Sequence, residues 1–363
     1  MSLVTLDAAR LASREGNRSA LARLALVMLA GLLVLSVGIS LFTGASGVSA
    51  RDAALIWLGL AGPDAADQAR TLVIINDIRL PRTVLAIMVG AGLAIAGVVM
   101  QGMFRNPLAD PGLVGVSAGA GLGAVLFIVL GGTVLAPVSL VLGIYAIPIA
   151  AFAGGALTTI VLYRVATHGG RTEIATMLLA GIAIGALSGA VTGVLVYLAN
   201  DVQLRDLTFW GLGSLAGANW TKVLASAPFM AGGIVASLAL WRGLNALTLG
   251  EASAHHMGVD VQRLKSLAIG AVAALVGAAV AVSGGIGFVG IVVPHLLRIL
   301  IGPDHRYLLP ASGLLGASFL LCADAVSRIV VAPAELPIGI VTASVGGPFF
   351  LYILLRRRND LAW

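Results

Sequence analysis

Ten apolar stretches follow one another along the chain, and shorter polar segments separate them. A helix needs about 20 mostly apolar residues to cross a bilayer. The stretches predict ten membrane-spanning helices, at about residues 24–43, 83–103, 112–131, 137–163, 174–199, 222–241, 266–283, 286–301, 308–330 and 336–355. The eighth stretch is short and rich in glycine. The pattern therefore predicts an all-α polytopic membrane protein.

Three polar segments are longer than simple connectors: residues 44–82, 200–221 and 242–265. The second contains a predicted short helix at Leu207–Leu215. The third contains a predicted surface helix at Glu251–Met257, which ends at Gly258, because glycine readily adopts the backbone conformation that follows a helix. No appended soluble domain is predicted.

The basic residues indicate which side of the membrane holds the termini. Of the 22 lysines and arginines, 15 fall on the side of the two termini and 7 on the other side. Lysine and arginine are enriched in cytoplasmic segments. We therefore expect a single transmembrane domain over residues 1–363, with a cytoplasmic N-terminal segment at 1–23 and a cytoplasmic tail at 356–363. The net charge of +6 then reflects topology and not nucleic-acid binding.

Composition indicates that the bilayer is the main solvent of this chain. Charged residues make up 10% of it, compared with about a quarter in soluble domains. Glycine accounts for 47 of the 363 residues. Gly181, Gly185, Gly189 and Gly193 recur at every fourth position and form a stripe that a neighbouring helix can approach closely. Helix packing is the simplest interpretation of this stripe.

The sequence lacks the motif for ATP hydrolysis. A P-loop requires a Gly-Lys pair, and neither Lys222 nor Lys265 follows a glycine. An ATPase that drives this protein would therefore be another chain. Cys322 is the only cysteine, so no disulfide or cysteine-based metal site is expected.

Few ionisable residues fall within the spans. Asp324 is the main one, and Arg328 follows it by four residues, a spacing that allows the two to pair on one helix face. Charges at membrane depth are often functional, but pairing is the simpler interpretation. The five histidines show no metal-ligand pattern: His168, His255, His256, His295 and His305. We expect no catalytic residue, no metal and no cofactor bound by this chain.

Several long motifs occur in the first and last thirds of the chain. The first group is Arg79-Leu-Pro-Arg82 and Met100-Gln-Gly-Met-Phe-Arg-Asn-Pro-Leu-Ala-Asp-Pro-Gly-Leu113. The second group is Gly284-Gly-Ile-Gly-Phe-Val-Gly-Ile-Val-Val-Pro-His-Leu-Leu-Arg298, Glu335-Leu-Pro-Ile-Gly339 and Gly346-Gly-Pro-Phe-Phe350. Together they resemble the permease family of ATP-binding-cassette (ABC) importers for iron–siderophore, haem and cobalamin. The resemblance runs from about residue 24 to the C-terminus.

The resemblance implies a type II ABC importer fold, with ten helices in each subunit of a homodimer. It implies two cytoplasmic ATPase subunits that carry ATP and Mg, and a periplasmic binding protein that delivers the cargo. The chain would be a non-catalytic transport subunit in the bacterial inner membrane, in contact with lipid. For the cargo we expect haem, delivered by a haem-binding protein, with a ferric siderophore or cobalamin as the alternative.

The resemblance also assigns a docking role to three arginines on the outer side. Arg79, Arg82 and Arg328 match positions that receive acidic residues of the binding protein. Exposed guanidinium groups would steer an acidic partner and pair with its carboxylates. Contact with lipid head groups is the alternative.

On the inner side, the segment Leu249–Val259 is similar to the coupling helices of the family. This similarity implies that Gly250, Glu251, His255 and Gly258 lie where the ATPase transmits its motion. An interfacial amphipathic helix is the alternative interpretation.

Two further segments match the transport path of the family. Asn106 and Leu108 align with the inner gate, where a proline between them would break a helix. Arg205, Phe209 and Trp210 match the short outer helix at the mouth of the path, where Arg205 could meet an anionic group such as a haem propionate.

Two other classes of protein compete with this interpretation. An ion-coupled secondary transporter would need a relay of buried acids, which this chain mostly lacks. A membrane scaffold or receptor would leave the inner loop and the outer arginines without a common purpose.

Overall fold

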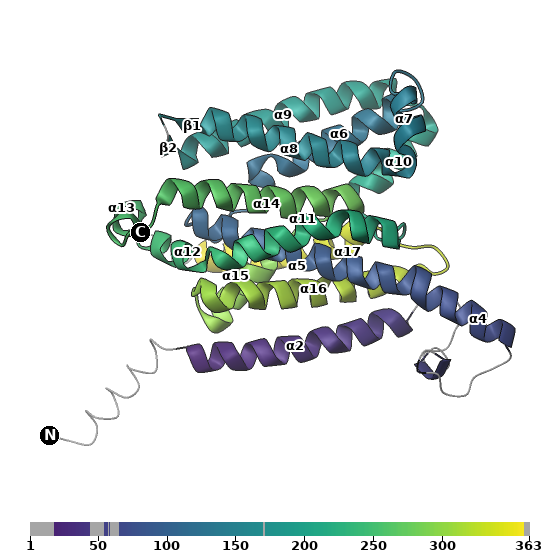
Figure 1. Cartoon of the computed structure of the whole chain (residues 1–363), viewed down its shortest axis with the longest axis horizontal. Helices are drawn as coiled ribbons and strands as arrows, with labels where there is room; N and C mark the ends of the chain where they lie inside the picture. The colour runs from purple at the N-terminus through teal and green to yellow at the C-terminus, as the bar shows by residue number, and fades with distance from the viewer. Residues whose placement is uncertain (1–17, 44–53, 57, 59–64, 170, 359–363) are drawn as a thin grey trace.

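The computed structural model describes residues 18–43, 54–56, 58, 65–169 and 171–358, and its long helices run side by side (Figure 1). Most of the predicted terminal segment 1–23 and of the predicted tail 356–363 lies outside these residues. The labelled elements are α2 (Ser19–Phe42), α4 (Ala65–Val73), α5 (Leu80–Met103), α6 (Val116–Leu130), α7 (Ala136–Leu142), α8 (Ala146–Ala166), β1 (Thr167–His168), β2 (Arg171–Thr172), α9 (Ile174–Leu198), α10 (Asp201–Gly211), α11 (Trp220–Ala239), α12 (Trp241–Thr248), α13 (Glu251–His256), α14 (Val261–Ser283), α15 (Val289–Ile301), α16 (His305–Ile329) and α17 (Ile338–Arg358).

Each of the ten predicted apolar stretches is helical, which confirms the all-α prediction. Among the described residues, seven helices are long and apolar enough to cross a bilayer. Three shorter apolar helices complete the set: Val116–Leu130, Val289–Ile301 and Ile338–Tyr352. The chain is therefore a multi-pass membrane protein.

Two of the predicted spans differ from the structure, one in where it begins and one in its continuity. The second spanning helix does not begin near residue 83, because α4 continues through a π-helical segment, Ile74–Arg79, directly into α5. Its first turns are polar, so the apolar pattern did not include them. The fourth stretch divides into α7 and α8 at Gly143, whose φ of 51° is unfavourable for other residues.

The short helix α10 begins earlier than predicted, at Asp201. Asn200 accepts a hydrogen bond from the Gln203 amide, and the Gln203 side chain accepts one from the Asn200 amide, both at 3.0 Å. This reciprocal pair satisfies two amide groups that the first turn leaves free. The helix ends at Gly211, and Gly213 then turns the chain with a φ of 73°.

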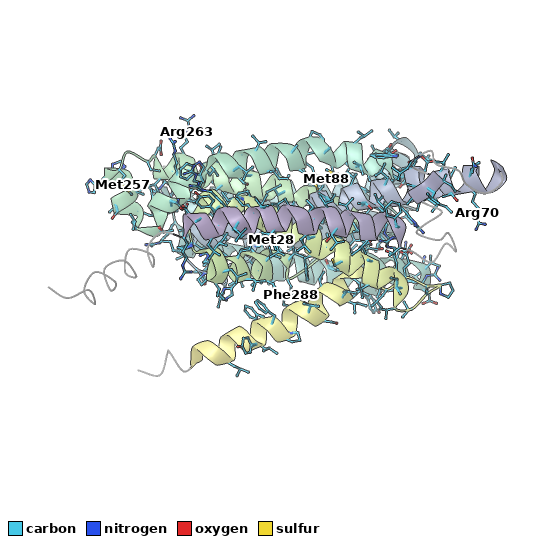
Figure 2. All side chains as sticks on the ribbon, turned by 90° about the horizontal axis from the view of Figure 1, so that it is seen from below. Met28, Arg70, Met88, Met257, Arg263 and Phe288 are labelled. Atoms are coloured by element: carbon cyan, nitrogen blue, oxygen red, sulfur yellow. The ribbon has the colours of Figure 1, made fainter. Side chains whose placement is uncertain are left out.

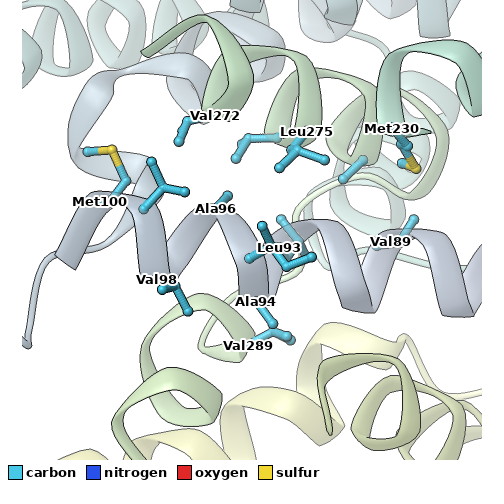
Figure 3. Packing of buried hydrophobic residues seen from close by; sticks show 14 of the residues in the cluster. Val89, Leu93, Ala94, Ala96, Val98, Met100, Met230, Val272, Leu275 and Val289 are labelled. Carbon is cyan, nitrogen blue, oxygen red and sulfur yellow. The ribbon is translucent and has the colours of Figure 1, made fainter. Parts of the chain in front are cut away.

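Helix α5 forms the centre of the core and packs against α11, α14, α15 and α16. Figure 3 shows its apolar side chains directed toward α14 and α11 on one side and toward α15 on the other. A Cβ atom added to Gly90 would collide with the backbone carbonyl of Gly316 on α16. This close approach of small residues is how helices associate within a bilayer.

The two ends of the bundle carry different elements (Figure 1). The β-hairpin and α13 lie at one end, which we call the α13 end, and α10 lies at the opposite end, the α10 end. Helices α2 and α9 form opposite outer faces, and α17 leans away from the bundle (Figures 1 and 2). On α9, Gly185, Gly189 and Gly193 have open space beside them, whereas Gly181, the first glycine of the predicted stripe, is buried within the chain.

Candidate functional site

Arg82 and Arg328 share one buried carboxylate near the α10 end of the bundle. Arg82 Nη2 lies 2.8 Å from Asp324 Oδ1, and Arg82 Nη1 lies 2.9 Å from Glu335 Oε1. Arg328 Nε lies 3.1 Å from Asp324 Oδ2, which confirms the predicted pairing four residues apart on α16. The Asp324 residue is completely buried. Asp324 therefore ties α16 to α5 through Arg82 and also pairs with Arg328 on its own helix.

The prediction that Arg79, Arg82 and Arg328 are exposed is wrong for this single chain. Their exposed fractions are 4%, 6% and 5%. Backbone carbonyls at the end of α2 cover this site: Leu41 O accepts from Arg79 Nη1 at 2.8 Å, and Thr43 O accepts from Arg328 Nη1 at 2.9 Å. The sequence could not reveal these partners, because they lie on distant helices. The docking role of the three arginines stays a prediction.

At the α13 end, the predicted surface helix is present as α13. Gly250 and Gly258 flank it, with φ values of 105° and 83° that favour glycine. Ala254 is buried and fixes the helix against α12 and α14, whereas His255 is exposed. Glu251 opens the helix and is half-buried. Helix α13 is therefore a short surface helix that packs against the rest of the chain through one face.

Lys265 is a site residue that the sequence analysis missed. It lies on α14 and is only 2% exposed. Its Nζ atom lies 2.9 Å from Glu251 Oε1 and donates to the Thr172 carbonyl at 2.8 Å. A cavity of about 640 Å³ lies beside these groups, between α13 and the β-hairpin. No direct signal was present in the sequence, because Lys265 is the last residue of the polar segment 242–265 and both of its partners come from other elements.

The segment after α5 forms a tight turn. Helix α5 ends at Met103, and the side chain of Asn106 accepts a hydrogen bond from the Leu108 amide at 2.9 Å. Arg105 has a φ of 49°, a conformation that few residues other than glycine adopt. The helix therefore ends before Pro107, as predicted, and Asn106 is exposed.

Near the α10 end, a cavity of about 510 Å³ is lined by Phe209 and Trp210, as well as by Lys222 at the start of α11. Asp206 also lines it, but no carboxylate lies within 4 Å of the Lys222 amine in the described part of the chain. Arg205 is exposed and is not among the lining residues. The structure thus brings together the two predicted aromatic residues with a lysine that the sequence analysis named only in excluding a P-loop.

A smaller cavity of about 270 Å³ connects Trp210 with the loop that follows the predicted gate. Asp110 and Phe288 line it, together with glycines of the segment before α15. Burial raises the pKa of the Asp110 carboxyl above its usual value, although the Gly112 amide donates to it at 2.7 Å. Asn106 and Leu108 do not line either cavity.

The described residues contain no group of three or more histidine, cysteine, aspartate or glutamate side chains that could hold a metal ion. The expectation that this chain binds no cofactor stays a prediction.

Comparison with known proteins connects these features. Residues 32–356 match the model of the FecCD transport family. The hemin transport system permease protein HmuU of Yersinia pestis is 47% identical over 286 residues, which cover 78% of this chain and 84% of that protein. The cobalamin import system permease protein BtuC of Halobacterium salinarum is also 47% identical, over 285 residues, or 78% of this chain and 74% of that protein. The vitamin B12 import system permease protein BtuC of Escherichia coli strain HS is 38% identical over 342 residues, or 92% of this chain and 95% of that protein.

A solved structure supports the same assignment. A metal-chelate type ABC transporter in an inward-facing conformation superposes with a TM-score of 0.78 at 34% identity, and the match covers 91% of this chain and 98% of that one. With 325 of its residues inside the family model, the chain belongs to the FecCD transport family and is a permease of the ABC importer class.

Proposed function

We propose that this chain imports haem across a bacterial inner membrane, as the transmembrane subunit of a type II ABC importer. The observation that carries the cargo is the 47% identity with a hemin permease over 286 residues. The cavity near the α10 end supports it, because Phe209 and Trp210 offer apolar contact to a flat macrocycle and Lys222 offers a positive charge to its propionates. Cobalamin is the second candidate, because two cobalamin permeases match this chain as well.

The transporter would be a homodimer of this chain with two ATPase subunits and a periplasmic haem-binding protein. The open glycine face of α9 provides a surface for the second copy. Helix α13, with Gly250, Glu251, His255 and Gly258, would dock into the ATPase at the cytoplasmic side. The arginines Arg79, Arg82 and Arg328 would receive the binding protein on the opposite side, after partial release of their internal partners.

Reconstitution tests this proposal directly. The chain would be co-purified with its cognate ATPase and binding protein and placed in liposomes whose lumen contains a high-affinity haem acceptor. We expect haem to accumulate only when ATP is supplied. Uptake of cobalamin or a ferric siderophore in place of haem would retain the importer and replace the cargo, whereas uptake of none of them with ATP would overturn the proposal.

A further inference from the structure

Lys265 is buried in a position that joins three elements. Lysine is rarely buried unless it is paired, and the Lys265 ammonium group is held by the carboxylate of Glu251 on α13 and by the carbonyl of Thr172 on β2. The side chain itself comes from α14. A single cation thus bridges α13, α14 and the β-hairpin.

A second contact fixes the hairpin to the same helix. The Thr172 amide donates to Gln262 Oε1 at 2.7 Å, and Gln262 lies one turn before Lys265 on α14. Both backbone groups of Thr172 are therefore bound by α14 side chains. The hairpin cannot shift along α14 without breaking both hydrogen bonds.

The hairpin leads directly into α9. Helix α9 begins at Ile174, and the Glu173 amide just before it donates to the Ala166 carbonyl at the end of α8 at 2.9 Å. A displacement of Thr172 would therefore move the first turn of α9. Since α9 carries the open glycine face, it is the helix whose position would affect a second copy of the chain.

We propose that Lys265 is a positioning residue that transmits movement of α13 to α9, through the contacts Glu251–Lys265–Thr172. This inference rests on the proposed function, in which α13 docks into the ATPase. Glu251 then acts as the end of an internal link, with its carboxylate directed toward Lys265. The β-hairpin, which has no role in the sequence analysis, becomes the second part of this link.

The test uses the complete transporter in haem-acceptor liposomes and measures haem transported for each ATP hydrolysed. Lys265→Met removes the charge and keeps the length, and Glu251→Gln removes the acid. We expect each variant to lower this ratio at least about fivefold, while the ATPase still co-purifies and hydrolyses ATP. The double variant should be no worse than either single variant, because both changes break one link. Lys265→Arg should retain most of the ratio.

Arg263→Met is the matched control, because Arg263 lies on the same turn region of α14 but is exposed and projects away from the bundle (Figure 2). It should transport normally. A normal ratio in Lys265→Met would overturn the inference while wild-type transport upholds the proposed function. Loss of the ATPase from purified Lys265→Met and Glu251→Gln would also overturn it, because Lys265 would then only maintain the docking surface. Failure of the wild type to transport haem would instead count against the proposed function.

Discussion

At the scale of single residues, one buried acid organises a small network of paired charges near the α10 end of the bundle. Asp324 serves both Arg82 and Arg328, and Glu335 serves Arg82. A buried charge that loses its partner is costly, whereas an exposed pair contributes little. The two acids therefore differ in their expected contribution, because Asp324 is completely buried and the Glu335 side chain is 38% exposed.

Asp324→Asn should destabilise the protein strongly. The change keeps the shape but leaves two guanidinium groups without their shared carboxylate, which should cost about 3–5 kcal/mol of unfolding free energy. Glu335→Gln, the control in the same network, should cost about 1 kcal/mol or less. Denaturant titration of the purified protein in detergent measures both changes. Equal losses in the two variants would show that Asp324 is not the centre of the network.

Lys222 should matter only for cargo that carries a carboxylate. With haem, we expect Lys222→Gln to raise the KM about tenfold, since a hydrogen bond to a charged group contributes roughly 1.5–3 kcal/mol. With haem dimethyl ester, which has no free propionate, the same variant should resemble the wild type. Lys222→Arg should retain haem uptake. A larger effect of Arg205→Gln than of Lys222→Gln would assign the propionate to Arg205 instead.

At the scale of elements, the apolar pattern predicted each spanning helix but not the polar ends. All ten stretches are helical, whereas α4 was missed because four of its nine residues are polar and interrupt the apolar ones. The pairing of Asp324 with Arg328 was predictable from a spacing of four on one helix. The pairing of Arg82 with Asp324 was not, because it joins residues 242 positions apart. Distance along the chain also explains why Lys265 was missed, because the Thr172 carbonyl that it binds lies 93 positions away. Lys222 was missed because the residues that line its cavity come from several separate segments.

The glycine at the end of α13 provides a test at this scale. Gly258 has a φ of 83°, which costs other residues roughly 1–2 kcal/mol. Gly258→Ala should therefore shift the end of α13 and lower the haem transported for each ATP by about fivefold. Gly270→Ala is the control, because Gly270 lies within α14 with open space beside it. Normal coupling in Gly258→Ala would remove this end of the helix from the mechanism.

At the scale of the whole molecule, the described bundle has an internal core and apolar outer faces that it does not cover itself, among them those of α2 and α9. Helix α5 is almost entirely buried. Helices α2 and α9 lie on opposite faces (Figure 1). In each, only 17% of the most apolar 18-residue segment is buried within the chain. Lipid suits the large apolar side chains of α2, whereas the small residues of α9 suit close contact with another helix.

The two faces should therefore behave differently in a cross-linking experiment. In a Cys322→Ser background, Gly189→Cys should form a disulfide-linked dimer on mild oxidation in membranes, because the glycine stripe of α9 would face the same stripe of a second copy. Val27→Cys is the matched control: Val27 lies on α2, is 70% exposed and would face lipid. Each variant would be separated on a non-reducing gel, at several protein-to-lipid ratios. A dimer that forms only with Gly189→Cys, and that persists on dilution with lipid, supports a specific contact through α9. Equal cross-linking of the two variants, decreasing together on dilution, would reflect chance collision and would exclude α9 as the dimer surface.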